Sequence, residues 1–66
     1  MSEVIMHNKK LLTRTKLIKA LRRHVISSGT EYRDRMDMVS AIGELRNGGL
    51  DIQAVANRWE SKGYKI

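Results

Sequence analysis

The spacing of apolar residues predicts a first helix from about residue 13 to residue 27. Thr13 or Thr15 is a suitable N-cap, because a threonine hydroxyl can accept a hydrogen bond from a free amide of the first turn. Ser27-Ser28-Gly29 ends this helix, since glycine readily adopts the left-handed conformation found just beyond helix ends. The apolar residues that recur on one face of the helix are Leu17, Ile18, Leu21 and Val25.

A second helix is predicted from Thr30 or Glu31 to Asn47. Thr30 can cap it, and Glu31 and Asp34 fall in the first turn, where the helix dipole favours negative charge. Asn47-Gly48-Gly49 ends it. The expected inward face consists of Tyr32, Met36, Val39, Ile42 and Leu45, with Met38 alongside.

The segment from Leu50 to Ile66 fits two different structures. As a helix it would be capped by Asp51, with apolar residues at helical spacing up to Trp59. As a hairpin, a strand from about Leu50 to Glu60 would turn through Ser61-Lys62-Gly63 into Tyr64-Lys65-Ile66. Helix propensity favours the first structure and turn chemistry favours the second, so periodicity leaves both open.

The chain is short enough to form only one small domain. Its 66 residues include no cysteine, so packing or self-association must supply the stability that disulfides or a thiolate zinc site would give. Residues 1–8 show no periodicity and are predicted to be a flexible arm, which leaves residues 9–66 as the domain. Trp59 is expected in the core. No run approaches the roughly 18 apolar residues that cross a bilayer, and a cytoplasmic location is expected.

Basic residues are concentrated in the first half of the sequence. The chain has 13 lysines and arginines against 7 acidic residues, and no acidic residue falls between Val4 and Thr30. This asymmetry favours a polyanionic partner, with a solvated basic face as the simpler alternative. The residues of this stretch that are expected to contact phosphates are Lys9, Lys10, Arg14, Lys16, Arg22 and Arg23, and Lys19 falls among them.

The sequence offers little for catalysis or metal binding. His7 and His24 are isolated among basic residues, and no cysteine, glycine-rich phosphate loop or paired-histidine motif is present. A non-enzymatic protein without a cofactor or metal is therefore expected.

The start of the second helix carries candidates for DNA contact. Arg33 and Arg35 could reach phosphates or the edge of guanine, where the planar guanidinium forms two hydrogen bonds. Ser40 would project from the same helix. Ion pairing of the two arginines with Glu31, Asp34 or Asp37 is the structural alternative.

One stretch resembles a known protein family. The residues concerned are Arg35, Ser40-Ala41-Ile42, Leu45-Arg46, Gly48-Gly49 and Ile52. They are similar to the recognition helix and first wing strand of small phage and prophage winged helix-turn-helix DNA-binding proteins. Arg58-Trp59 and the stretch from Lys62 to Ile66 look like the wing hairpin of that group. The resemblance covers about half the chain, and it favours the hairpin for the C-terminal segment.

The predicted fold is mainly α, a small winged-helix-like domain of two or three helices with a C-terminal β-hairpin; the alternative is an all-α three-helix domain. The resemblance implies a transcription regulator of a phage or mobile element that binds duplex DNA, either alone or as a homodimer. The second helix would enter the major groove, and Arg58, Lys62 and Lys65 would touch the flanking backbone. The alternative function is a small inhibitor or adaptor that docks on a larger protein through Met36, Met38, Val39 and Trp59.

Overall fold

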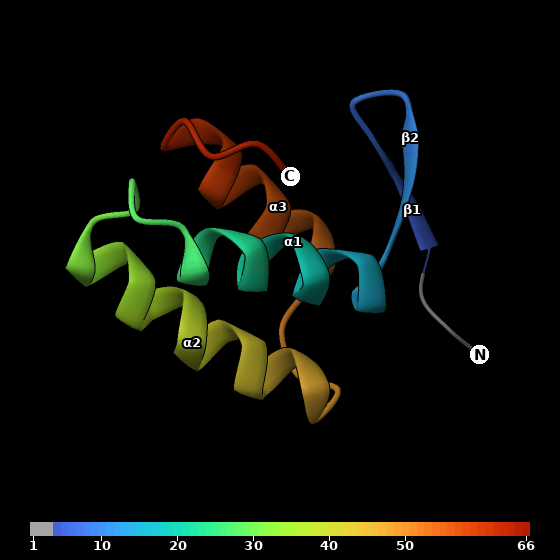
Figure 1. Cartoon of the computed structure of the whole chain (residues 1–66). Helices are drawn as coiled ribbons and strands as arrows, with labels where there is room; N and C mark the ends of the chain where they lie inside the picture. The colour runs from blue at the N-terminus through green and yellow to red at the C-terminus, as the bar shows by residue number, and fades with distance from the viewer. Residues whose placement is uncertain (1–3) are drawn as a thin grey trace.

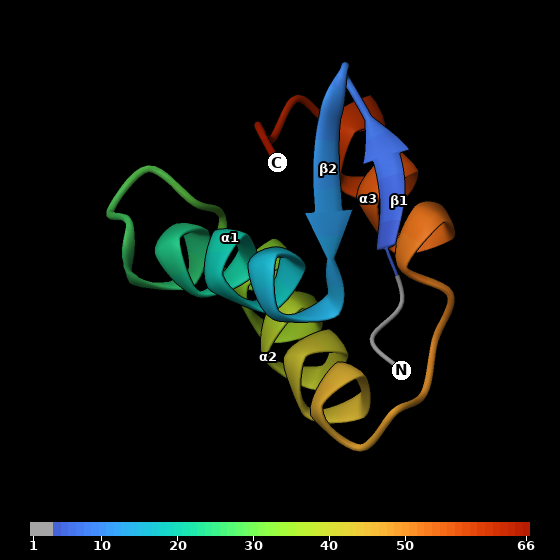
Figure 2. The same ribbon diagram turned by 90° about the vertical axis from the view of Figure 1, so that its right-hand side faces the viewer.

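A β-hairpin followed by three helices forms the structure (Figure 1), a computed structural model that describes residues 4–66. The elements in chain order are β1 (Val4–His7), β2 (Lys10–Thr13), α1 (Arg14–Ile26), α2 (Tyr32–Arg46) and α3 (Ile52–Ser61). In the view of Figure 2 the hairpin lies beside α3 and the first turn of α1. The mainly helical class predicted from the sequence is confirmed.

The hairpin replaces most of the predicted flexible arm. β1 and β2 are antiparallel, with Ile5 opposite Leu12 and His7 opposite Lys10. Asn8 and Lys9 form the turn, and both have positive φ, 52° and 65°. Two positive φ values are the mark of a type I′ turn, whose twist matches that of the strands it joins. Of the arm predicted over residues 1–8, residues 1–3 lie outside the described residues, and the rest belongs to this hairpin.

The first helix is confirmed with nearly the expected bounds. Thr13 is its N-cap, and its hydroxyl accepts a hydrogen bond from the Lys16 amide at 3.1 Å. Leu17 and Leu21 are fully buried, as the apolar spacing predicted. At the other end Ser27 adopts an extended backbone, and its amide bonds back to the His24 carbonyl.

The second helix has the expected length, but it is rotated relative to the predicted inward face. Met38, Ile42 and Leu45 are buried, whereas Tyr32 and Met36 point to solvent. Val39, also expected on the inward face, is half exposed. The N-cap is Glu31, so the prediction that Thr30 caps the helix was wrong. The Thr30 hydroxyl instead donates to the His24 carbonyl at 2.6 Å, which fastens the α1–α2 turn.

The C-terminal segment is a helix, so the prediction of a C-terminal hairpin was wrong. α3 buries Ile52, Val55, Ala56 and Trp59, which recur at helical spacing. Gly63, with φ of 95°, follows the helix as glycine does at many helix ends. The stretch expected to form the first wing strand is therefore the α2–α3 loop and α3, and α2 runs unbroken from Tyr32 to Arg46.

The core lies between the three helices and the inner face of the hairpin. Trp59 is 1% exposed, which confirms its predicted place, and its indole packs edge-on against Tyr64 at 5.7 Å between ring centroids. The cluster around it consists of Leu12, Leu17, Leu21, Met38, Ile42, Leu45, Ile52, Val55 and Ala56. Apart from Trp59 it is aliphatic, so the domain depends on close packing of branched side chains and methionine.

Candidate functional site

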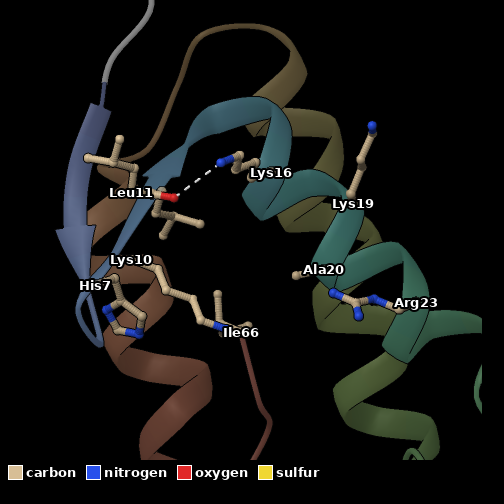
Figure 3. A pocket seen from close by; sticks show the side chains of 9 residues that line it. His7, Lys10, Leu11, Lys16, Lys19, Ala20, Arg23 and Ile66 are labelled. Atoms are coloured by element: carbon tan, nitrogen blue, oxygen red, sulfur yellow. Dashed lines mark hydrogen bonds between the residues drawn. The ribbon is translucent and has the colours of Figure 1, made fainter.

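A groove with a cationic rim runs between β2 and α1. It has a volume of about 560 Å³, and Figure 3 shows its lining side chains coming from the hairpin, from α1 and from the end of the chain, with Lys19 directed away from the others. Leu11, Leu12, Ala20 and Ile66 form its apolar floor. Its rim carries His7, Lys10, Lys16, Lys19 and Arg23. We call this feature the cationic groove.

The helical periodicity of α1 explains why its cations gather there. Residues three, four and seven apart share one face of a helix, so Lys16, Lys19 and Arg23 line up along one side. Arg14 precedes Arg23 by nine positions, which is about half a turn around the cylinder at 3.6 residues per turn. Arg14 therefore faces α2, while the other three face the groove.

A second hollow of about 540 Å³ adjoins the groove and extends it toward the end of α1. It shares Lys10, Arg23 and Ile66 with the groove and adds His24, Ser27 and Lys65. A shallower hollow on the outer side of α1 is lined by Lys19, Arg22, Arg23 and Ile26. The three hollows together make one continuous basic surface along α1.

No acidic side chain lines any of these three hollows among the described residues. The nearest carboxylate to the hairpin end is that of Glu60 on α3, and it is engaged elsewhere. It accepts a hydrogen bond from Asn8 Nδ2 at 2.7 Å and lies 3.5 Å from His7 Nε2. The Asn8 hydrogen bond is the main reason that the pKa of Glu60 lies below its usual range. Glu60 thus ties the turn of the hairpin to α3 and, at the groove rim, lies beside His7.

The last residues of the chain form the far wall of the basic surface. Tyr64 donates its hydroxyl proton to Asp34 Oδ2 at 2.6 Å, and Lys62 Nζ lies 3.4 Å from Asp34 Oδ1. The Tyr64 hydrogen bond is the main cause that lowers the pKa of Asp34, and the same bond raises the pKa of Tyr64. The His24 ring completes the attachment, with Nε2 placed 2.7 Å from the Lys65 carbonyl. This arrangement could not be predicted from the sequence, because its members are distant along the chain.

Two of the predicted DNA-contacting arginines hold the α1–α2 pair together instead. Arg14 donates to the carbonyls of Leu45, Gly49 and Leu50 at 3.3, 2.5 and 3.2 Å, in the last turn of α2 and just beyond it. Arg35 donates to the Ser27 and Thr30 carbonyls at 2.9 and 3.1 Å, beyond the last turn of α1. Each guanidinium donates to backbone carbonyls at or just beyond a helix end, where intrahelical partners are lacking. The predicted pairing of Arg35 with neighbouring acids is not what the structure shows.

Two more candidates form surface ion pairs. Arg58 lies 3.6 Å from Asp37, and Lys62 pairs with Asp34 as described above. Both cations also lie over the Trp59 ring, 5.3 and 5.1 Å from its centroid. Of the remaining predicted contacts, Arg22 lines the outer hollow of α1, whereas Lys9 at the hairpin turn and Arg33 and Ser40 on α2 are exposed and scattered. The expected docking cluster is also divided, because Met38 and Trp59 are buried while Met36 and Val39 are exposed.

Comparisons of the chain with family models, with curated proteins and with solved structures find no match. Within residues 4–66, no helix combines the length and apolar character that a membrane crossing requires. The same residues contain no group of three or more histidine and carboxylate side chains that could hold a metal ion.

Proposed function

We propose that the protein binds duplex DNA by holding its phosphate backbone against the cationic groove. The observation that carries this proposal is that Lys10, Lys16, Lys19 and Arg23 line one groove that no described acidic residue lines. Lys65 extends the same surface at the adjoining hollow. Backbone phosphates are the most densely charged partner available to such a surface, since duplex DNA carries one negative charge per about 1.7 Å of axis.

The internal contacts of the basic residues support this assignment. Arg14, Arg35, Arg58 and Lys62 contact carbonyls or carboxylates of the chain itself, and they are therefore poorly placed to bind an external anion. The groove cations differ, since the one hydrogen bond shown for them is a long contact of 3.5 Å from Lys16 Nζ to the Leu11 carbonyl. Ammonium and guanidinium groups that keep their hydrogen-bonding capacity can donate it to phosphate oxygens.

The size of the surface fits several phosphates. α1 has 13 residues and is therefore about 20 Å long, enough to follow a number of phosphates along one strand. The groove floor is apolar, and its described lining includes no asparagine or glutamine, the side chains that read adenine. The proposal is accordingly one of backbone binding. Reading of bases by Arg33 and Ser40 on α2, and membership of the winged helix-turn-helix group, stay predictions.

The test is a titration of a fluorescently labelled random duplex, followed by anisotropy, with a groove variant and a matched control. Arg23→Gln removes a groove cation, whereas Arg58→Gln removes an exposed cation from α3 that pairs with Asp37. We expect Arg23→Gln to weaken binding several-fold at low salt and to reduce the salt dependence by about one unit, because one phosphate contact is lost. Arg58→Gln should bind like the unaltered protein, since a surface ion pair contributes little to the fold.

Two results would count against the proposal. Equal weakening by both substitutions would mean that net charge, and not the groove, governs binding. No binding of the unaltered protein at low salt would exclude DNA as the partner and direct attention to a protein partner.

A further inference from the structure

An apolar stripe runs along the exposed face of α2. Tyr32, Met36 and Val39 are 74%, 49% and 48% exposed, and Gly43 continues their line. Their spacing of four, three and four residues is the alternation of the seam positions in a coiled coil, with an average of 3.5 residues. We call these four residues the α2 stripe. Such a seam on the outside of a helix has no partner within the described chain.

Packing among the described residues does not require a glycine at position 43 of this stripe. It lies in the interior of a helix, its φ is not positive, and a Cβ added there would meet nothing within 4 Å. Glycine is less favourable than alanine at such a position. The one physical property that it provides here is a notch in the helix surface, into which a large side chain from outside could fit.

We propose that α2 packs antiparallel against α2 of a second copy of this chain. A two-fold axis level with residues 37 and 38 places Tyr32 of each copy over Gly43 of the other, so that the largest side chain of the stripe meets the smallest. The same axis places Met36 against Val39 of the second copy. A two-fold interface of this kind must be complementary to itself, and this stripe is.

The charges beside the stripe are complementary to those of a second copy, and the pairing of Tyr32 with Gly43 sets the antiparallel direction. Arg33 and Glu44 lie on one flank of the stripe at opposite ends of α2, and an antiparallel pair brings Arg33 of one copy near Glu44 of the other. On the second flank, Arg46 comes near Glu31 of the second copy. A parallel pair would instead bring Arg33 near Glu31 of the second copy and would separate it from Glu44, so the charge exchange described below distinguishes the two directions. This match identifies a second copy as the occupant, because an unrelated surface need not carry the reverse pattern.

The inference does not depend on DNA binding. The cationic groove lies on the side of α1 that faces away from α2, so pairing through the α2 stripe leaves it open on both copies. Pairing also removes Tyr32, Met36 and Val39 from water. This added burial stabilises a chain of 66 residues, whose core is small. The residues that bind phosphate and those that self-associate are different sets.

The first test is sedimentation equilibrium of the unaltered chain, of Val39→Lys and of Ala54→Lys over a range of concentrations. Ala54 is exposed on α3, away from the stripe, so its substitution adds the same charge elsewhere. The unaltered chain and Ala54→Lys should approach twice the 7.6 kDa of one chain as concentration rises. Val39→Lys should dimerise at least ~10-fold more weakly, because a lysine would be buried without a partner. A monomer at all concentrations for the unaltered chain would overturn the proposal.

Charge exchange supplies a second test that does not rely on the apolar residues. Arg33→Glu alone and Glu44→Arg alone each set like charges against one another twice in the dimer, so each variant should be more monomeric than the unaltered chain. Mixed together, the two variants should form a heterodimer, because both opposed pairs then carry opposite charges. Helix content measured by circular dichroism should not change, since both positions are exposed. Failure of the mixture to associate more strongly than either variant alone would refute the antiparallel arrangement.

Discussion

Replacing Arg14 by methionine is expected to destabilise the fold severely while leaving the cationic groove intact. The guanidinium joins the start of α1 to the carbonyls of Leu45, Gly49 and Leu50, where α2 ends. Methionine keeps the apolar stem of the side chain and removes all three hydrogen bonds. The bond to the Leu45 carbonyl is partly buried, so water replaces it less readily than the two exposed bonds to Gly49 and Leu50.

The expected loss can be estimated from hydrogen-bond energies. A hydrogen bond to a charged group contributes about 1.5–3 kcal/mol, and three bonds from one guanidinium do not add. We therefore expect a loss of about 2–4 kcal/mol. A domain of this size has a free energy of unfolding of about 3–10 kcal/mol, so the substitution removes a large part of it. At roughly 4–8 °C per kcal/mol, Tm should fall by at least about 10 °C.

Thermal and urea unfolding of Arg14→Met, followed by far-ultraviolet circular dichroism, measure this loss. Arg22→Met is the matched control, because Arg22 is an exposed arginine on the same helix. The control should change the free energy of unfolding by less than about 0.5 kcal/mol, as surface substitutions usually do. If both variants unfold alike, or if Arg14→Met costs less than about 1 kcal/mol, the assignment of Arg14 to the fold is wrong.

Three further substitutions test the backbone and the pH dependence. Lys9→Gly should raise the free energy of unfolding by about 1 kcal/mol, because glycine adopts the positive φ of this type I′ turn without strain. A lower free energy of unfolding, measured with urea, would contradict this. Leu50→Asn should raise it by about 0.5–1 kcal/mol, since Leu50 is exposed and has φ of 67°, and an unchanged Tm would count against strain there. The lowered pKa of Asp34 means that its contribution is present at neutral pH and is lost as pH falls below about 4. Asp34→Asn should therefore be less stable at neutral pH and should lose less stability on acidification, and an unaltered pH profile would refute this reasoning.

The helices could be predicted where caps and apolar spacing agreed. Thr13 and the Ser27-Ser28-Gly29 stop defined α1 to within a residue or two, because both ends depend on local chemistry. The face of α2 was harder to predict. Met36 and Met38 lie two positions apart, so two inward faces fit the spacing almost equally well. In the structure Met38 is buried and Met36 is exposed. Arg35, which lies beside the buried face, donates to carbonyls of the α1–α2 turn.

The two errors about strands have different physical origins. β1 was missed because Val4-Ile5-Met6 does not alternate, and because its turn uses lysine where Asn-Gly would have indicated a hairpin. The C-terminal hairpin was favoured by a family resemblance over helix propensity, and the propensity of residues 52–61 was correct.

Part of the candidate site was visible in the sequence, since the basic stretch from Lys9 to Arg23 contains most of the groove cations. The sequence did not show that some of these basic residues stabilise the fold while others remain exposed in the groove. Arg14 and Arg23 look alike in sequence, and only the packing of α2 against one side of α1 makes the first structural and leaves the second exposed. Lys65 enters the site because Tyr64 and His24 fix the end of the chain beside α1, which is a long-range effect.

The salt dependence of duplex binding tests the proposed function most directly. If Lys10, Lys16, Lys19, Arg23 and Lys65 each neutralise one phosphate, the logarithm of the binding constant should fall against the logarithm of salt concentration with a slope of about −4 to −5. The triple variant Lys16→Gln, Lys19→Gln and Arg23→Gln should reduce the slope to about −2. Absence of binding at low salt, or a slope that the triple variant does not change, would contradict the proposal that the cationic groove holds DNA.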